Sequence, residues 1–153
     1  MDEQKRMIEY AKHAIWEVYN EQEGRINYMM QPEYYDCSFE NGTLSFRFPI
    51  LEWEGNRVMN LHGGALASQF DFTIGALARF YAGEHFIPTV SLDMKYVRPA
   101  KVGDYIIVTA SKVNAGRKIT QLTCEAVNEE TGKIIATGAS VYINVDTDKE
   151  RKK

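Results

Sequence analysis

The stretch NRVMNLHGGALASQFDFTIGALARF, residues 56–80, contains residue types that could carry chemistry. Asp71 lies among apolar and small residues, and Arg79 is the only other charge after the HGG turn at 62–64. A carboxylate buried in such a segment is costly unless a nearby group or a reaction uses it. The position of Asp71 is therefore the first feature that needs a physical reason.

The HGG turn is the predicted start of a long helix. Gly63 and Gly64 leave the first backbone N–H groups unobstructed by side chains. Unpaired N–H donors and partial positive charge at a helix N-terminus stabilise an oxygen that gains negative charge. A carboxylate two turns further on, at Asp71, would activate a nucleophile, so the pair suits the addition of water to a carbonyl. The same residues also fit a structural interpretation, with the glycines serving backbone geometry, His62 serving packing and Asp71 pairing with a buried hydroxyl or imidazole.

The face of the helix that carries Asp71 is narrow, because most of its neighbours three and four residues away are small. The sequence predicts that Asp71 projects into a tight, poorly hydrated crevice, whereas Phe70 and Leu77 are predicted core anchors. These neighbours are Ala67, Ser68, Ile74, Gly75 and, one turn further on, Ala78.

Hydrophobic periodicity predicts two helices and six strands. An apolar stripe predicts a helix over residues 2–22, with Gly24 as its stop, and the central helix runs from about 63 to 81. Asn41-Gly42 between two apolar runs predicts a β-hairpin. Residues 50–61 have no clear period and are predicted to form a loop. The predicted strands are 34–40, 43–50, 89–99, 104–114, 119–129 and 134–145.

This order of elements predicts an α+β fold, in which a mainly antiparallel sheet wraps around the central helix and an extra helix precedes it. The last four strands are expected to form a meander. We expect a single domain over 1–153, with the N-terminal helix at 2–22, the core at 34–145 and a charged, disordered tail at 146–153.

Composition narrows the class of protein. The chain has 153 residues, 44% of them hydrophobic and 25% charged, with a formal net charge of −3, which argues against a nucleic-acid partner. No apolar run is long enough to span a bilayer and the N-terminus does not read as a signal peptide, so we expect no membrane partner and a cytoplasmic location. The two cysteines, Cys37 and Cys124, make no disulfide framework and are expected to be small buried residues. The histidines lack metal-ligand spacing, so no metal site is predicted; they are His13, His62 and His85.

Three ordered blocks resemble the hotdog-fold acyl-CoA thioesterases, in the branch of the phenylacetic-acid-pathway thioesterases and mammalian thioesterase superfamily member 2. The first block is Asn56 followed by LHGG and Asp71. The second is VSLDMKYVRPAKVGD, residues 90–104, and the third is GRKITQLTCEAVNEETGKIIATG, residues 116–138. Together they are far more specific than HGG alone.

The resemblance implies a hotdog fold, hydrolysis of acyl-CoA to free acid and coenzyme A, and an active site at the interface of two subunits. Gly63 would supply the N–H that polarises the thioester carbonyl, and His62 would orient that turn or contact the thioester. Asn56 would bind the water or the carbonyl. The partner subunit's Asp71 would be the general base or the nucleophile, and the partner subunit's Ser91 would orient the water or the acid.

Coenzyme A is part of the substrate in this scheme, and no cofactor is expected. Gly64, in the same turn as Gly63, is assigned to substrate binding. Basic residues beside accessible N–H groups favour phosphates, so Arg117 and Lys118 in the 114–118 turn are candidates for the nucleotide, as are Arg98 and Lys101. A homodimer is expected, paired further into a dimer of dimers.

Two alternatives remain open: a non-catalytic acyl-CoA-binding module and a hotdog-fold acyl-CoA dehydratase or hydratase. The absence of a GxSxG elbow and of a histidine partner for either cysteine argues against an acyl-enzyme on serine or cysteine. The acyl group is not fixed by the sequence. Aromatic residues that line either an acyl tunnel or simply the core are Phe70, Phe72, Phe80, Tyr81 and Phe86.

Overall fold

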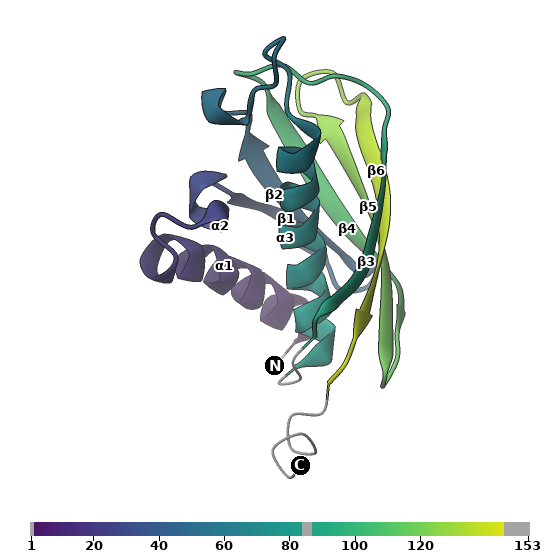
Figure 1. Cartoon of the computed structure of the whole chain (residues 1–153). Coiled ribbons are helices and arrows are strands. Elements are labelled where there is room, and N and C mark those ends of the chain that lie inside the picture. Colours follow the sequence, from purple (N-terminus) through teal and green to yellow (C-terminus); the bar gives the residue numbers. More distant parts are fainter. Residues whose placement is uncertain (1, 84–86, 146–153) are drawn as a thin grey trace, which may run out of the picture.

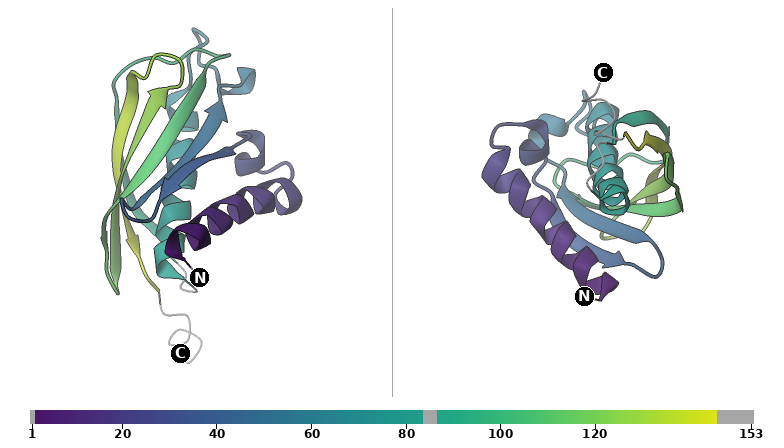
Figure 2. Two further views of the ribbon diagram at one scale, coloured as in Figure 1. Left: turned by 180° about the vertical axis from the view of Figure 1, so that it is seen from behind. Right: turned by 90° about the horizontal axis from the view of Figure 1, so that it is seen from below.

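A computed structural model describes residues 2–83 and 87–145. A curved sheet wraps around the long helix α3, and helix α1 lies beside the end of the sheet formed by β1 and β2 (Figures 1 and 2). The predicted charged tail at 146–153, and the candidate Phe86, lie outside the described residues. The elements are α1 Glu3–Glu21, α2 Ile26–Met29, β1 Glu33–Ser38, β2 Thr43–Pro49, the 3₁₀ helix η1 Glu52–Glu54, α3 Gly63–Ala82, β3 Thr89–Tyr96, β4 Tyr105–Ala115, β5 Ile119–Asn128 and β6 Ile134–Ile143.

Helix α1 forms where its apolar stripe predicts it. Asp2 caps its N-terminus by accepting a hydrogen bond from the Gln4 N–H at 3.3 Å. The helix ends at Glu21, and Gly24 follows in the turn with a φ of 75°, a conformation that glycine adopts without strain. The short helix α2 after this turn was not predicted. The buried stripe of α1 is Met7, Ala11, Ala14 and Val18.

The sheet has six strands in the order β1-β2-β4-β5-β6-β3, and each neighbouring pair is antiparallel. The antiparallel sheet and the β1–β2 hairpin confirm the predictions. The expected meander of four strands is wrong, because β3 pairs with β6 and only β4, β5 and β6 follow one another. Strand β3 therefore lies at one edge of the sheet.

The 97–104 connection explains this topology. It is long enough to cross the end of the sheet, where it bonds to the 50–61 segment instead of turning back on β3. Leu61 N–H donates to the Ala100 carbonyl at 2.7 Å, and Ile50 N–H donates to the Asp104 carbonyl at 2.8 Å. These bonds start β4 beside β2. Strand periodicity could not predict that this connection bonds to the 50–61 segment.

The core is the contact between α3 and the concave face of the sheet. Phe70, Ile74 and Leu77 are fully buried, which confirms Phe70 and Leu77 as core anchors. A Cβ built on Gly138 of β6 would lie 2.9 Å from the Asp93 carbonyl oxygen and 3.1 Å from the Phe70 ring. The close approach of helix, β3 and β6 therefore requires a residue without a side chain at this position.

The aromatic residues of α3 could line an acyl tunnel or belong to the core, and the structure places most of them in the core. Phe70, Phe72 and Phe80 are buried, and Phe72 packs its ring against Phe46 with the ring centroids 5.1 Å apart. Tyr81 is half-buried beneath the ammonium group of Lys112. None of these side chains lines the cavities described below.

Both cysteines are buried, as expected, and they are not joined to each other. Burial raises the pKa of the Cys124 thiol well above its usual value. None of the helices in residues 2–83 and 87–145 combines the length and the apolarity that crossing a bilayer requires.

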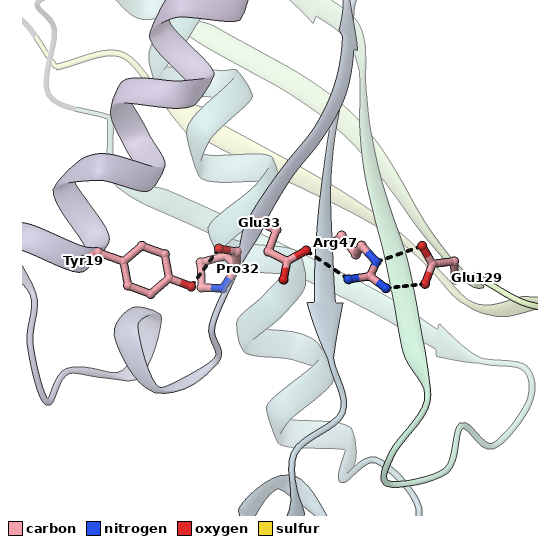
Figure 3. A network of polar contacts seen from close by, with 5 residues as sticks. All are labelled: Tyr19, Pro32, Glu33, Arg47 and Glu129. Atoms are coloured by element: carbon pink, nitrogen blue, oxygen red, sulfur yellow. Dashed lines mark hydrogen bonds and ion pairs between the residues drawn. The ribbon is translucent and has the colours of Figure 1, made fainter.

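An ion-pair network holds the outer face of the sheet together (Figure 3). The Arg47 guanidinium donates to both carboxylate oxygens of Glu129 at 2.8 Å and to Glu33 at 3.0 Å. It also lies 3.6 Å from the centre of the Tyr105 ring. In the same view, the Tyr19 hydroxyl donates to the Pro32 carbonyl at 3.0 Å and so ties α1 to the start of β1. Arg47 thus links β1, β2, β4 and the turn after β5.

We expect Arg47→Lys to lower the free energy of unfolding by about 1 kcal/mol at neutral pH, because lysine keeps the charge but loses the paired bonds and the flat stacking on Tyr105. Arg47 lowers the pKa of Glu129, so this contribution is present above the ordinary carboxyl pKa and is lost as pH falls through the lowered one. Urea unfolding at neutral and acidic pH measures both effects. Glu129→Gln should lower the free energy of unfolding at neutral pH by a similar amount. If Arg47→Lys is as stable as the wild type at neutral pH, the network does not have this role.

Candidate active site

His62 caps the N-terminus of α3. Its main chain is extended, with φ −63° and ψ 136°, and its Nδ1 accepts a hydrogen bond from the Gly64 N–H at 2.9 Å. Because Nδ1 accepts, the neutral ring carries its proton on Nε2. The side chain is exposed and orients the turn. Of the two roles that the resemblance implies for His62, orienting the turn is the one visible in this chain.

The Gly63 N–H is the donor that the turn leaves open. Within residues 2–83 and 87–145, no acceptor is hydrogen-bonded to it. The Tyr96 hydroxyl donates to the Gly63 carbonyl at 2.8 Å, and a Cβ on Gly63 would lie 3.2 Å from the Tyr96 ring. Tyr96 therefore fixes the turn from the side of β3, and the turn has little room for a side chain at Gly63.

Asn56 is held by its own loop. Its Oδ1 accepts hydrogen bonds from the N–H groups of Val58 and Asn60, both at 3.0 Å, and its N–H donates to the Asn60 carbonyl at 2.7 Å. This use of the oxygen leaves the Nδ2 amide as a donor with no acceptor in the described part of the chain. Asn56 is thus arranged to donate to an oxygen, not to accept a proton.

The 50–61 segment is more ordered than the predicted loop. It contains η1, and isolated bridges pair Gly55 with Leu61 and Asn60 with Lys101. The segment is a loop, as predicted, and its backbone pairing with the 97–104 connection has no signature in side-chain periodicity.

Two cavities meet the turn. Gly63 lines the first, of about 350 Å³, and Gly64 lines the second, of about 390 Å³. The first combines polar groups with an apolar wall that includes Leu61, Leu66 and Ile135, and the second is more apolar still. The other residues named here are Asn56, Asn60, Tyr96 and Arg98 in the first cavity, and Ile26, Trp53, Glu54, His62, Ala65 and Ser68 in the second.

Asp71 is exposed in this chain, so the predicted dry crevice is wrong for a single subunit. Its Oδ1 accepts a hydrogen bond from the Thr89 hydroxyl at 3.2 Å. Tyr142, on the strand beside Thr89, is buried, and this burial raises its pKa to about 12, with Asp71 adding to the rise. The helix buries the residues that follow Asp71, but position 71 itself is exposed to solvent beside the start of the edge strand β3.

Asp71 and the Gly63 N–H do not meet within one chain. They are eight residues apart on a straight helix, which corresponds to about 12 Å along its axis. Asp71 lines neither of the two cavities. A single reacting carbonyl cannot contact both groups of the same chain.

Ser91 is also apart from the turn. It is half-buried in β3, where its carbonyl accepts a hydrogen bond from the Ser140 hydroxyl at 2.6 Å. Its side chain lines a separate hollow of about 200 Å³ together with residues of β5 and β6. A register shift between Thr89 and Ser91 interrupts the alternation of β3. Val90, next to this shift, is exposed, and Tyr96 at the end of the strand is also exposed, although both belong to its apolar set.

The predicted basic residues are divided between the two ends of the sheet. Arg98 lines the cavity of Gly63 and donates to the Ile134 carbonyl at 2.9 Å, and Lys101 lies beside it in the 97–104 connection. Arg117 and Lys118 lie in the turn after β4, at the far end of the strand, where their carbonyls accept bonds from Asn144. Of the basic candidates, Arg98 alone borders the Gly63 cavity.

Sequence reasoning missed Glu54, Gln69 and Tyr96. Glu54 is 1% exposed and Gln69 is fully buried. The burial of Gln69 could have been predicted from the helical spacing, because Gln69 lies on the same buried face of α3 as Leu66 and Thr73. The burial of Glu54 could not have been predicted, because the 50–61 segment has no hydrophobic periodicity. Among the described residues no three His, Cys, Asp or Glu side chains gather as a metal site would require.

Comparison with known proteins identifies the family of this chain. The thioesterase superfamily model matches residues 59–135, and the chain belongs to this superfamily. Acyl-coenzyme A thioesterase 13 of Mus musculus is 36% identical over 91 residues, which cover 58% of this chain and 64% of that protein. The human protein of the same name is 33% identical over 99 residues, which cover 63% and 69%. The match thus spans slightly less than two thirds of the mouse relative.

Solved structures share the fold. Zebrafish thioesterase superfamily member 2 has a TM-score of 0.77 at 21% identity, over 88% of this chain and 95% of that one. The PaaI protein from the E. coli phenylacetic acid degradation operon has a TM-score of 0.73 at 16% identity, over 88% and 95%. A Streptococcus pneumoniae thioesterase protein solved with coenzyme A has a TM-score of 0.67 at 18% identity, over 74% and 85%. The predicted hotdog architecture and the resemblance to this family are confirmed.

The capping role of His62 can be tested by substitution. We expect His62→Ala to lower the free energy of unfolding by about 1 kcal/mol, because the Gly64 N–H loses its acceptor, whereas His62→Asn should recover most of the loss. Urea unfolding gives the free energies, and the NMR shift of the Gly64 amide reports the bond. Equal stability of the alanine and asparagine variants would contradict the cap.

Proposed function

We propose that this protein hydrolyses acyl-CoA thioesters to a free carboxylic acid and coenzyme A. The observation that carries the proposal is the open N–H of Gly63 at the N-terminus of α3, facing a cavity that also holds Asn56 and Arg98. Membership of the thioesterase superfamily and relatives named acyl-coenzyme A thioesterase support it. The Streptococcus pneumoniae structure with coenzyme A supports this choice of substrate.

The thioester carbonyl oxygen would dock on the Gly63 N–H. The partial positive charge of the helix end stabilises the negative charge that this oxygen gains when a nucleophile adds to the carbon. The Asn56 amide, with its oxygen already engaged, is the second donor available to the carbonyl or the attacking water. His62 and Gly64 keep the turn in place.

The carboxylate would come from a second copy of the chain. If two α3 helices pack antiparallel about a twofold axis near Ala67, residue 63 of one helix lies beside residue 71 of the other. The outward strip of α3 supports such an approach, because Gly64 and Asp71 are exposed and Ala67 and Ser68 are partly so. The site would then consist of Gly63 from one subunit and the partner subunit's Asp71.

Strand β3 supports the same pairing. It is an edge strand of the sheet, with Val90 56% and Tyr96 57% exposed. An open apolar edge is one that proteins cover by association. Ser91 lies on this strand two residues after Thr89, which binds Asp71, and its role in the partner's site remains an expectation. Further pairing into a dimer of dimers remains an expectation.

Two chemical routes fit these positions. In the first, Asp71 takes a proton from water as the water oxygen bonds to the thioester carbon, the C–S bond breaks, and the sulfur leaves as thiolate and becomes the thiol of coenzyme A. In the second, the Asp71 carboxylate attacks the same carbon, releases the thiolate and forms a mixed anhydride, which water opens to the acid and Asp71. Neither route requires a cofactor.

The coenzyme A side of the substrate would extend from the cavity of Gly63 along Arg98, with Lys101 nearby. Arg117 and Lys118 lie at the other end of their own sheet, so they could serve this site only as residues of another subunit. The acyl group remains open between fatty and aromatic acids. A cytoplasmic location also stays a prediction.

The rival functions predict different behaviour. An acyl-CoA-binding module would bind substrate without turnover, and its affinity would survive the loss of Asp71. A dehydratase or hydratase would change the acyl chain without releasing thiol. Relatives named acyl-coenzyme A thioesterase favour hydrolysis over these two alternatives.

We expect Asp71→Ala to reduce kcat by at least about 100-fold on whichever acyl-CoA the wild type hydrolyses, because the general base or nucleophile is lost. Thiol release from short, long and aromatic acyl-CoAs measures this. Arg79→Gln is the matched control, since Arg79 is also exposed on α3 two turns further on. Unchanged turnover in Asp71→Ala would remove Asp71 from the mechanism, and no thiol release by the wild type would overturn the proposed function.

Mixing Asp71→Ala with Asn56→Ala, which loses the proposed second donor and should also lose most of its turnover, tests the shared site. In a dimer formed from Asp71→Ala and Asn56→Ala subunits, one of the two sites has both natural residues. After random reassociation, about a quarter of the sites, and hence of the wild-type activity, should return. Absence of recovery, with mixed dimers verified by mass spectrometry, would place the complete site within one chain.

A further inference from the structure

Glu54 is a buried acid that the proposed reaction does not use. It is 1% exposed, whereas its neighbour in η1, Glu52, is exposed. Gln69 of α3, which contacts it, is fully buried. Burying a carboxyl and an amide costs free energy unless both groups are hydrogen-bonded. Their burial therefore calls for an explanation.

The bonds of Glu54 reach three parts of the site. Its Oε2 accepts from the Leu51 N–H at 2.8 Å, and its Oε1 accepts from Gln69 Nε2 at 3.0 Å. Its main-chain carbonyl accepts from the His62 N–H at 2.8 Å. One residue therefore joins the start of η1, the cap of α3 and the second turn of α3.

These bonds enclose the loop that carries Asn56. The chain leaves Glu54, passes Asn56 and returns to His62, and the Gly55–Leu61 bridge closes the loop at its base. The distance between the Asn56 amide and the Gly63 N–H is set by where this base sits against α3. The hydrogen bond between Gln69 Nε2 and Glu54 Oε1 ties this base to α3 through buried side chains.

We propose that Glu54 and Gln69 form a positioning pair that holds the Asn56 amide and the Gly63 N–H in register for one carbonyl oxygen. This inference rests on the proposed function, since it assigns the pair to that same site. Neither residue touches the reacting atoms. Their effect is on the alignment of two donors, and alignment affects the transition state more than ground-state binding.

The hydrogen bonds that Glu54 and Gln69 can form indicate which substitutions will test the pair. Gln69 Oε1 is buried and has no donor among the described residues. A glutamine at position 54 would accept from the Leu51 N–H with its oxygen and donate to this unpartnered Oε1 after the Gln69 amide turns. Burial raises the pKa of Glu54 while its bonds to Leu51 and Gln69 oppose the rise, so a neutral group of the same shape is tolerated there.

The experiment measures kcat and KM separately for thiol release by the full-length protein, with the best acyl-CoA of the panel. We expect Glu54→Ala and Gln69→Leu each to lower kcat by about tenfold or more with little change in KM, and Glu54→Gln to restore kcat to within about threefold of wild type. Glu52→Ala, an exposed acid in the same η1, is the matched control and should behave as wild type.

A second readout does not depend on activity. Amide hydrogen exchange at His62 and Gly64, whose N–H groups are hydrogen-bonded to the Glu54 carbonyl and to His62 Nδ1, should accelerate in Glu54→Ala and Gln69→Leu but not in Glu54→Gln or Glu52→Ala. If the wild type releases no thiol, the proposed function fails while this exchange pattern still decides whether the pair holds the turn. Wild-type kcat in Glu54→Ala, or equal losses in Glu54→Ala and Glu54→Gln, would overturn the inference. If Glu54→Ala does not fold, Gln69→Leu and Glu54→Gln carry the same comparison.

Discussion

The structure depends on the burial of α3 against the concave face of the sheet. Phe70, Ile74 and Leu77 are fully buried there, and burying each side chain of this size contributes about 1.5–3 kcal/mol. The helix comes so close that β6 has Gly138 where a Cβ would lie 2.9 Å from the Asp93 carbonyl. Because α3 cannot shift along the sheet without losing this fit, its N-terminal turn is held at one place relative to β3 and the 97–104 connection.

The fixed position of α3 provides the proposed site with a hydrogen-bond donor, and it also keeps the carboxylate of the same chain away from that donor. The turn at Gly63 presents an open N–H with little need for rearrangement, as a preorganised oxyanion donor should. The same rigidity keeps Asp71 about 12 Å away along the axis. Under the proposed function, catalysis would depend on association, since a second subunit would bring the carboxylate to the donor. Under the proposed function, the buried acid Glu54 and the exposed acid Asp71 would have different tasks: Glu54 would align the donors and Asp71 would react.

Much of the fold could be predicted, because its elements have local signatures. The stripe of α1, the Asn41-Gly42 hairpin and the apolar length of α3 all match the structure closely. The place of β3 could not be predicted in this way. Its edge position beside β6 results from backbone bonds such as Leu61 N–H to the Ala100 carbonyl, and backbone donors are the same in every residue. Side-chain patterns therefore specify which segments are strands but not which strands become neighbours.

For the site, the sequence by itself determined the chemistry available: an HGG turn at a helix start, an isolated carboxylate at Asp71 and an asparagine at Asn56. Only the tertiary structure decided which groups meet. It brought Asn56, Gly63 and Arg98 to one cavity, left Asp71 facing outward, and buried Glu54 against Gln69. The physical reason is that residue type fixes what a group can donate or accept, whereas burial and distance depend on contacts between segments far apart in the chain.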